Sequence, residues 1–247
     1  MLMDELANRY AAVQERIAAA AARAGRDPAE ITLVAVTKTW PAEVVAAAYA
    51  AGMRHFGENR AEELAEKRPQ VAQILGADAS DIVWHQIGTL QSRKTPLVAA
   101  HADLFHALDR LKVARRLSRD LVENGRALPT FIEVNLSGED SKSGYPAYHW
   151  ESDATQRQNL RTVVETAAQL PGLTLQGLMT MAPWQVADDV IRTVFQRTRR
   201  LSAWLQAEFP RLTLDRLSMG MTDDFEIAIE EGATHIRVGR ALFGERN

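Results

Sequence analysis

Lys38 is the residue in this sequence whose position most directly suggests covalent chemistry. It follows the segment Ile31–Thr37, which is mostly apolar and typical of a strand buried on both faces of a parallel sheet. A lysine at the mouth of such an apolar interior loses hydration, which disfavours its ammonium form and frees the neutral amine. The amine can then attack an aldehyde, so the sequence indicates a Schiff-base lysine. The ordinary alternative is a lysine whose charged end extends to solvent.

Polar or small residues also follow the other candidate strands. If those strands lie parallel in a barrel, the residues that follow them gather on one rim, where the active sites of such barrels lie. Each residue alone has an ordinary structural explanation, but their convergence on one rim predicts a binding site. They are Gly57, Glu58, Asn59, His85, Gly88, Gln91, Asn135, Ser137, Met179, Thr180, Ser218, Met219, Gly220, Arg237, Gly239 and Arg240.

Two late segments, Arg216–Asp224 and His235–Gly244, have the composition of an anion site. Their small residues Ser218, Gly220 and Gly239 allow close approach of the backbone, so loop amides and a hydroxyl could hold a phosphate.

Acidic residues argue against a simple site at the N-terminus of the helix that follows the first of these segments. Asp223 and Asp224 open that helix and would repel an anion. The spacing of Asp223 and Glu226 instead predicts a capping box.

Eight mostly apolar segments, nearly all separated by helical patterns, organise the chain. At 247 residues it is close to the roughly 250 typical of a (β/α)₈ barrel, so we predict a single TIM-barrel domain over residues 1–247 with an extra N-terminal helix at about residues 4–25. The alternative fold, a doubly wound open sheet, typically has a glycine-rich turn after its first strand, and this sequence has none there. Residues 135–156 form the longest polar stretch without periodicity, which predicts a mobile loop. The candidate strands are residues 31–37, 53–57, 82–88, 103–108, 130–136, 173–179, 212–218 and 235–239.

The composition excludes several classes of function. A net charge of −3 gives no general attraction for nucleic acid or anionic lipid, and the basic strip Arg197–Arg200 is typical of a solvated helix face. The absence of cysteine excludes disulfides, thiolate nucleophiles and cysteine-ligated metals, and we expect no metal site. Asp4, Glu5 and Glu15 rule out a signal peptide or membrane span near the start, so we expect a cytoplasmic protein.

Several motifs together resemble one known family, the pyridoxal phosphate homeostasis proteins. They are AVTKTWP, HFGENRAEE, WHQIGTLQSRK, GEDSKSGY, GLMTMAP and LSMGMTDDFEIAIEEGATHIRVGRALFGER, in the order in which the family has them. The resemblance runs from about Ile31 onward. It implies a barrel similar to the N-terminal domain of alanine racemase, with pyridoxal 5′-phosphate (PLP) carried on Lys38.

The resemblance also implies roles for other residues. Arg237 corresponds to the arginine that faces the pyridine nitrogen, and Asn59 and His85 resemble rim residues close to the cofactor. The departures from the family are two rim arginines, Arg60 and Arg93, and one extra residue in the loop NLSGEDSKSGY. The positions similar to phosphate holders are Ser218, Gly220, Gly239 and Arg240, with Met219 between the first two.

The sequence favours a cofactor carrier over an enzyme, and we assign no catalytic residue. In alanine racemase an additional C-terminal domain supplies a second base and a dimer contact, whereas this chain ends at Asn247, so we expect a monomer. Arg237 is permanently protonated and would weaken the electron sink of PLP. We expect intracellular PLP buffering that affects amino-acid balance indirectly, with PLP-dependent apoenzymes as recipients. The alternative is a PLP-dependent racemase or lyase that uses Tyr145 or Lys142; a protein-interaction module on Arg197–Arg200 has weaker support.

Overall fold

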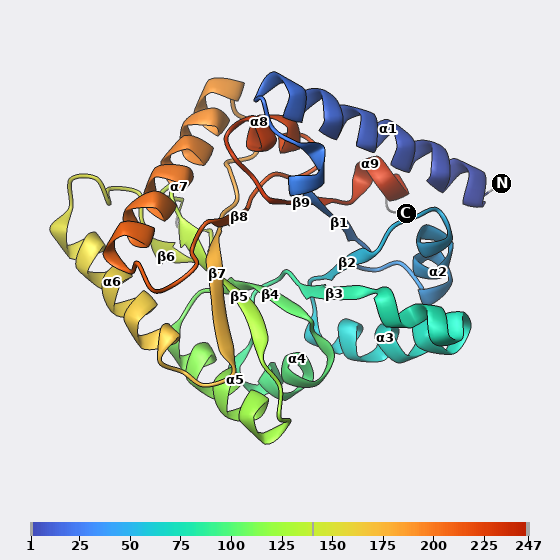
Figure 1. Cartoon of the computed structure of the whole chain (residues 1–247), viewed down its shortest axis with the longest axis horizontal. Helices are drawn as coiled ribbons and strands as arrows, with labels where there is room; N and C mark the ends of the chain where they lie inside the picture. The colour runs from blue at the N-terminus through green and yellow to red at the C-terminus, as the bar shows by residue number, and fades with distance from the viewer. Residues whose placement is uncertain (1, 140, 246–247) are drawn as a thin grey trace.

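The computed structural model, which describes residues 2–139 and 141–245, is a closed barrel of parallel strands with helices around it (Figure 1). The strand order is β4-β3-β2-β1-β9-β8-β7-β5, and pairing of β4 with β5 closes the barrel. The predicted TIM barrel is therefore confirmed, and each of its strands overlaps a predicted segment. The barrel strands are β1 (Thr32–Val36), β2 (His55–Glu58), β3 (Val83–Gln86), β4 (Leu104–Leu108), β5 (Leu128–Asn135), β7 (Leu173–Met179), β8 (Arg216–Ser218) and β9 (His235–Val238).

Amphipathic helices cover the outer face of the barrel. Their apolar sides pack on outward-facing strand residues such as Phe56, Trp84 and Phe105, which are all but fully buried. None of the helices among the described residues is both long and apolar enough to cross a membrane. The helices are α1 (Leu2–Arg23), α2 (Ala42–Ala50), α3 (Ala61–Leu75), α4 (Thr95–His101), α5 (Leu111–Glu123), α6 (Ala154–Ala168), α7 (Asp188–Glu208), α8 (Phe225–Glu230) and α9 (Arg240–Phe243).

The extra N-terminal helix, α1, lies along the outside of the barrel beside α8, α9 and α2 (Figure 1). It spans residues 2–23, close to the prediction. Arg16 and Arg23 form ion pairs with Glu226 and Glu230 of α8, while Leu6, Val13 and other apolar residues of α1 are buried beneath it. The helix thus covers the side of the barrel where the first and last strands meet.

The segment 135–156 is more ordered locally than a plain loop. Tyr145–Pro146 forms a short strand, β6, that pairs in parallel with β5 through Val134 and Tyr145. Trp150, a few residues further on, is buried against the core. The mobility predicted for this segment stays a prediction, and its residue 140 lies outside the described residues.

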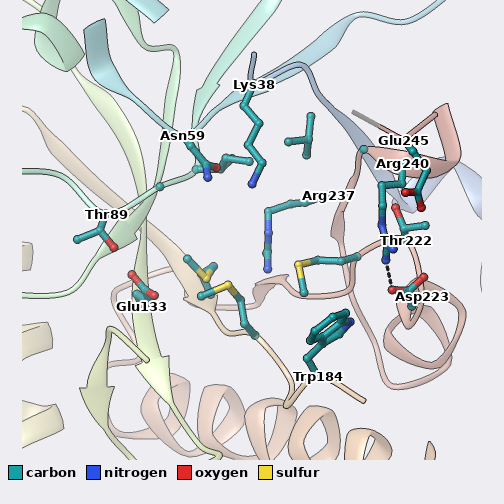
Figure 2. A pocket seen from close by; sticks show the side chains of 17 residues that line it. Lys38, Asn59, Thr89, Glu133, Trp184, Thr222, Asp223, Arg237, Arg240 and Glu245 are labelled. Atoms are coloured by element: carbon teal, nitrogen blue, oxygen red, sulfur yellow. Dashed lines mark hydrogen bonds and ion pairs between the residues drawn. The ribbon is translucent and has the colours of Figure 1, made fainter. Parts of the chain in front are cut away.

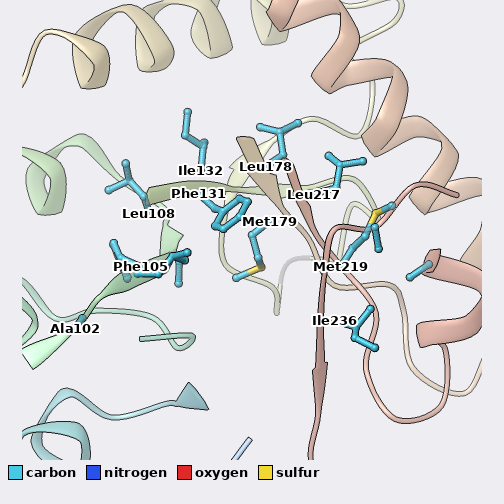
Figure 3. Close-up of a cluster of buried hydrophobic side chains, with 14 of the residues drawn as sticks. Ala102, Phe105, Leu108, Phe131, Ile132, Leu178, Met179, Leu217, Met219 and Ile236 are labelled. Carbon is cyan, nitrogen blue, oxygen red and sulfur yellow. The ribbon is translucent and has the colours of Figure 1, made fainter. Parts of the chain in front are cut away.

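The inside of the barrel is filled in part by imidazole rings. His85, His106 and His235 come from three strands and are buried, with Phe131 of β5 among them. The ring centroids of His106 and Phe131 are 4.9 Å apart, and those of Phe131 and His235 are 5.1 Å apart. Phe131 belongs to the buried apolar cluster of Figure 3, with Met179 of β7, Met219 directly after β8 and Ile236 of β9. Imidazole and phenyl rings therefore fill part of the barrel interior.

Candidate cofactor-binding site

A cavity of about 660 Å³ lies at the carboxyl ends of the barrel strands (Figure 2). Its wall combines a lysine, two arginines, buried and exposed acids and several methionines. Such a mixture of a largely apolar wall with a few convergent polar groups is typical of a small-molecule site. The lining residues are Val36, Lys38, Asn59, Ile87, Gly88, Thr89, Glu133, Met179, Met181, Trp184, Met221, Thr222, Asp223, Arg237, Gly239, Arg240 and Glu245.

The structure brings together only part of the predicted site. The predicted residues that line the cavity are Lys38, Asn59, Gly88, Met179, Arg237, Gly239 and Arg240. The cavity lining does not include the buried residues His85, Ser218, Met219 and Gly220, nor the rim arginines Arg60 and Arg93.

The turn that carries Lys38 is held by an ion pair from α3. Lys67 Nζ donates to the Thr37 carbonyl oxygen at 2.9 Å and to Glu63 Oε1 at 2.7 Å. The same Glu63 oxygen accepts a hydrogen bond from the Thr39 amide at 2.5 Å. Thr39 has φ of 69°, a left-handed conformation that a β-branched residue rarely adopts. The residues on both sides of Lys38 are therefore fixed, and its side chain points into the cavity (Figure 2).

Glu58, at the end of β2, completes this buried network. It accepts hydrogen bonds from Lys67 Nζ and from the Thr37 hydroxyl, each at 2.7 Å. Burial raises the pKa of Glu58 to about 7, although Lys67 and Thr37 favour the charged form. The network also fixes the backbone just before Asn59, which lines the cavity.

Gly88 allows β3 to approach Asn59 closely. A Cβ atom on Gly88 would lie 2.4 Å from the Asn59 carbonyl oxygen, so a larger residue would force the two loops apart. Gln86 Nε2 donates to the same oxygen at 2.9 Å. Asn59 is thus held against the β3 loop with its side chain toward the cavity (Figure 2).

Arg237, on β9, is a buried cation in the cavity wall. Its guanidinium donates to Ser218 Oγ at 2.6 Å and to the Thr180 carbonyl oxygen at 3.0 Å. Burial lowers its pKa to about 10, while Asp224 and Glu133 act in the opposite direction. The side chain therefore stays protonated at neutral pH, as the sequence prediction for its role requires.

A row of hydrogen bonds runs from Arg237 into the barrel interior. Ser218 Oγ lies 2.7 Å from His106 Nδ1, His106 Nε2 lies 2.8 Å from His85 Nδ1, and His85 Nε2 lies 3.0 Å from His55 Nδ1. Because Arg237 donates to Ser218, the serine hydroxyl can donate onward to His106 Nδ1. His106 then donates from Nε2 to His85, and His85 donates from Nε2 to His55. Burial holds the pKa values of His85 and His106 well below their usual range, which keeps these rings neutral. Ser218 and His85 therefore support Arg237 from below the cavity.

The histidines inside the barrel could have been recognised from the sequence. Four predicted strands each carry one histidine, namely His55, His85, His106 and His235. Read together, they could have indicated a row of imidazoles inside the barrel instead of a single rim residue.

The late loops differ from the predicted capping arrangement. The capping box is wrong: Asp224 occupies the N-cap position of α8, and its side chain accepts from the Met221 amide at 2.5 Å. Asp223 forms an ion pair with Arg240 across the cavity mouth, with Thr222 beside them (Figure 2). This pairing offsets the acid that was expected to repel an anion.

Glu133, on β5, is the main cavity residue that sequence reasoning missed. It is 1% exposed, and its Oε2 atom is buried with no hydrogen-bond partner among the described residues. Burial and the nearby Asp109 carboxylate raise the pKa of Glu133 to about 7, whereas Arg237 and Arg110 lower it. The available signal was an acid inside the otherwise apolar strand TFIEVNL.

Glu133 should make the folded state less stable as the pH rises. Its pKa is raised from 4.5 to about 7, so the folded state retains a proton that the unfolded chain releases. The free energy of unfolding therefore falls as the pH rises through this interval. Urea unfolding at a series of pH values should show Glu133→Gln gaining stability relative to wild type across the interval. Glu245→Gln, an exposed acid on the same cavity, is the control; parallel curves for wild type and Glu133→Gln would contradict the prediction.

Comparison with known proteins identifies the family. Residues 9–247 match the family described as alanine racemase, N-terminal domain. A Pseudomonas aeruginosa relative named pyridoxal phosphate homeostasis protein is 42% identical over 245 residues, which cover 99% of this chain and 97% of the relative. The chain belongs to the pyridoxal phosphate homeostasis protein family.

Two further proteins extend the comparison. The Escherichia coli K12 pyridoxal phosphate homeostasis protein is 39% identical over 249 residues, covering 99% of this chain and 98% of the relative. The structure of PipY from Synechococcus elongatus PCC7942 with PLP bound has 34% sequence identity and a TM-score of 0.81, and the match covers 97% of this chain and all of PipY. The family resemblance seen in the sequence motifs is thereby confirmed.

Proposed function

We propose that this chain binds PLP covalently on Lys38 and serves as a carrier in cytoplasmic PLP homeostasis. The observation that carries the proposal is the fixed lysine that points into a cavity with a buried arginine on the same wall. Membership of the pyridoxal phosphate homeostasis protein family and the PLP bound to PipY support it. PLP-dependent apoenzymes are the proposed recipients, and the protein is proposed to act as a monomer.

The residues of the cavity fit PLP. Lys38 supplies the amine, Arg237 can face the ring nitrogen, and the loops that contain Thr222 and Gly239–Arg240 offer a hydroxyl, amides and a guanidinium to the phosphate. Ser218, Met219 and Gly220 would act by shaping this loop, since their side chains or Cα atoms lie outside the cavity lining. When bound, PLP supplies an aldehyde carbon for the lysine and an electron-withdrawing ring.

One observation favours the enzyme alternative, a racemase or lyase. Glu133 is a buried acid that lines the cavity and could accept a proton. The two candidate bases from the sequence, Tyr145 and Lys142, are absent from the cavity lining, and Lys142 donates to the Met181 carbonyl oxygen at 3.2 Å. Arg237 keeps its own proton and cannot protonate the ring nitrogen, which weakens the electron sink that such enzymes use.

The interaction-module alternative loses support from the surface of α7. Arg197 forms a 2.7 Å ion pair with Glu151, and its guanidinium also donates to the Tyr148 carbonyl oxygen at 2.7 Å. Arg200 lies 3.6 Å from the same Glu151 carboxylate. This strip is therefore part of the internal charge pairing of the molecule.

The rate at which the PLP-loaded protein converts amino acids distinguishes the carrier proposal from the enzyme proposal. Protein loaded with PLP is incubated with single L- and D-amino acids in deuterated water, and α-proton exchange, racemisation and keto-acid formation are followed. We expect rates far below the roughly 1–1,000 s⁻¹ of ordinary enzymes, together with restored activity when the loaded protein is mixed with a PLP-dependent apoenzyme. Fast turnover that is lost in Lys38→Ala would establish the enzyme instead.

A further inference from the structure

Three buried oxygen atoms near β5 have no hydrogen-bond partner within the described part of the chain. They are Glu133 Oε2, Asp109 Oδ1 and the hydroxyl of Tyr145. Buried polar atoms are nearly always satisfied, so three of them in one region call for a ligand or water that supplies hydrogen.

The three groups belong to neighbouring elements. Asp109 directly follows β4, Glu133 lies on β5, and Tyr145 lies on β6, which pairs with β5 next to Glu133. Burial raises the pKa of Glu133 and that of Tyr145, and the Asp109 carboxylate acts electrostatically on both in the same direction. Of the three, Glu133 lines the cavity together with Lys38, and Asp109 and Tyr145 are not among the lining residues.

The local charge selects the kind of ligand. Glu133 and Asp109 are acidic, and Arg110 pairs with the other oxygen of Asp109 at 2.8 Å. The Arg237 guanidinium acts electrostatically on Glu133, but its hydrogen bonds go to Ser218 and Thr180. Glu133 Oε2, which accepts no hydrogen bond from the described residues, therefore suits a small group that carries several N–H donors and a positive charge. A primary ammonium meets both requirements.

We propose that Glu133, backed by Asp109 and Tyr145, is the binding point for the primary amine that exchanges with Lys38. This rests on the proposed function, because it names the class of molecule that takes the cofactor from that lysine. The Glu133 carboxylate receives the incoming ammonium at the wall of the cavity, in reach of the molecule that Lys38 holds.

The exchange balances without a further reactant. The incoming ammonium gives one proton to the Glu133 carboxylate, which leaves a neutral amine able to form a bond to the cofactor carbon. The bond between that carbon and the Lys38 nitrogen breaks, and the proton held by Glu133 passes to the released lysine amine. No oxidant or reductant takes part, and Glu133 ends as the carboxylate with which it began.

The test uses n-butylamine as the probe and cofactor-free protein for its first measurement. The pKa of Glu133 is followed by carboxyl ¹³C NMR, with the resonance assigned by its loss in Glu133→Gln. Binding of the ammonium should lower this pKa, because the charged carboxylate gains a cationic partner. An unchanged pKa at saturating n-butylamine would overturn the proposal and leave ordered water as the occupant.

The second measurement is release of PLP from loaded protein as n-butylamine is added. Glu133→Gln should need about ten- to a hundredfold more amine for half-maximal release, as expected for the loss of a hydrogen bond to a charged group. Glu43→Gln, which removes the same charge from an exposed position on α2 outside the cavity lining, should behave as wild type. Equal amine dependence in wild type and Glu133→Gln would overturn the inference, while PLP bound on Lys38 in both proteins would leave the proposed function intact.

Discussion

Replacing Lys38 with alanine should abolish covalent retention of PLP. Lys38 lies at a turn fixed by Lys67 and Glu63, and among the described residues it is the lysine that lines the cavity. Wild-type and variant proteins are incubated with PLP, reduced with borohydride and digested, and the modified lysine is located by mass spectrometry. Wild type should carry the label on Lys38, and the variant should carry none.

Lys142→Ala is the matched control for this result. Lys142 lies on the segment 135–156, outside the cavity lining, and forms an ion pair with Glu139. Its replacement should leave the label on Lys38 unchanged. Label found on Lys94 or Lys142 with Lys38 unmodified would show that the assignment of the cofactor lysine is wrong.

Lys67→Met should destabilise the folded protein by about 3–5 kcal/mol, because it removes one partner of a buried ion pair. Lys67 is 5% exposed, and its removal leaves the buried Glu58 carboxyl without its cation and the Thr37 carbonyl without its donor. Urea unfolding measures the change, provided that the slope with denaturant stays the same as in wild type. The variant should also take up PLP more slowly, since the strained Thr39 beside Lys38 loses part of its support.

A second ion pair on α3 provides the control for Lys67. Glu62, which like Lys67 lies on α3, pairs with Lys94 from outside that helix. Both side chains remain partly exposed, Lys94 at 25% and Glu62 at 43%. Lys94→Met should therefore cost only about 0–1 kcal/mol. Equal losses of stability in the two variants would mean that burial adds nothing to the Lys67 network, contrary to the structure.

The order of elements was accessible from sequence because it depends on local patterns. Continuous apolar runs predicted strands whose observed limits agree within a few residues, and the same holds for the predicted N-terminal helix. The rule that active sites lie where barrel strands end then placed Lys38, Asn59 and Arg237 correctly on one rim. The family motifs identified the same residues independently.

Side-chain direction was not accessible in the same way. Ser218 and His85 follow or end strands as the rim residues do, yet their side chains lie below the cavity and form the row of hydrogen bonds under Arg237. A residue near the end of a strand can point up to the rim or inward, and a shift of one position changes which it does.

The sequence by itself predicted the barrel and the position of Lys38 at the end of its first strand, because both depend on patterns of apolar residues along single segments. Only the tertiary structure decided which groups surround that lysine. The Lys67 network joins β1, β2 and α3. The oxygens of Glu133, Asp109 and Tyr145 that lack a partner among the described residues come from β5, the end of β4 and β6. The charge and hydrogen bonding of a buried group depend on neighbours distant in the chain, and no local pattern encodes those neighbours.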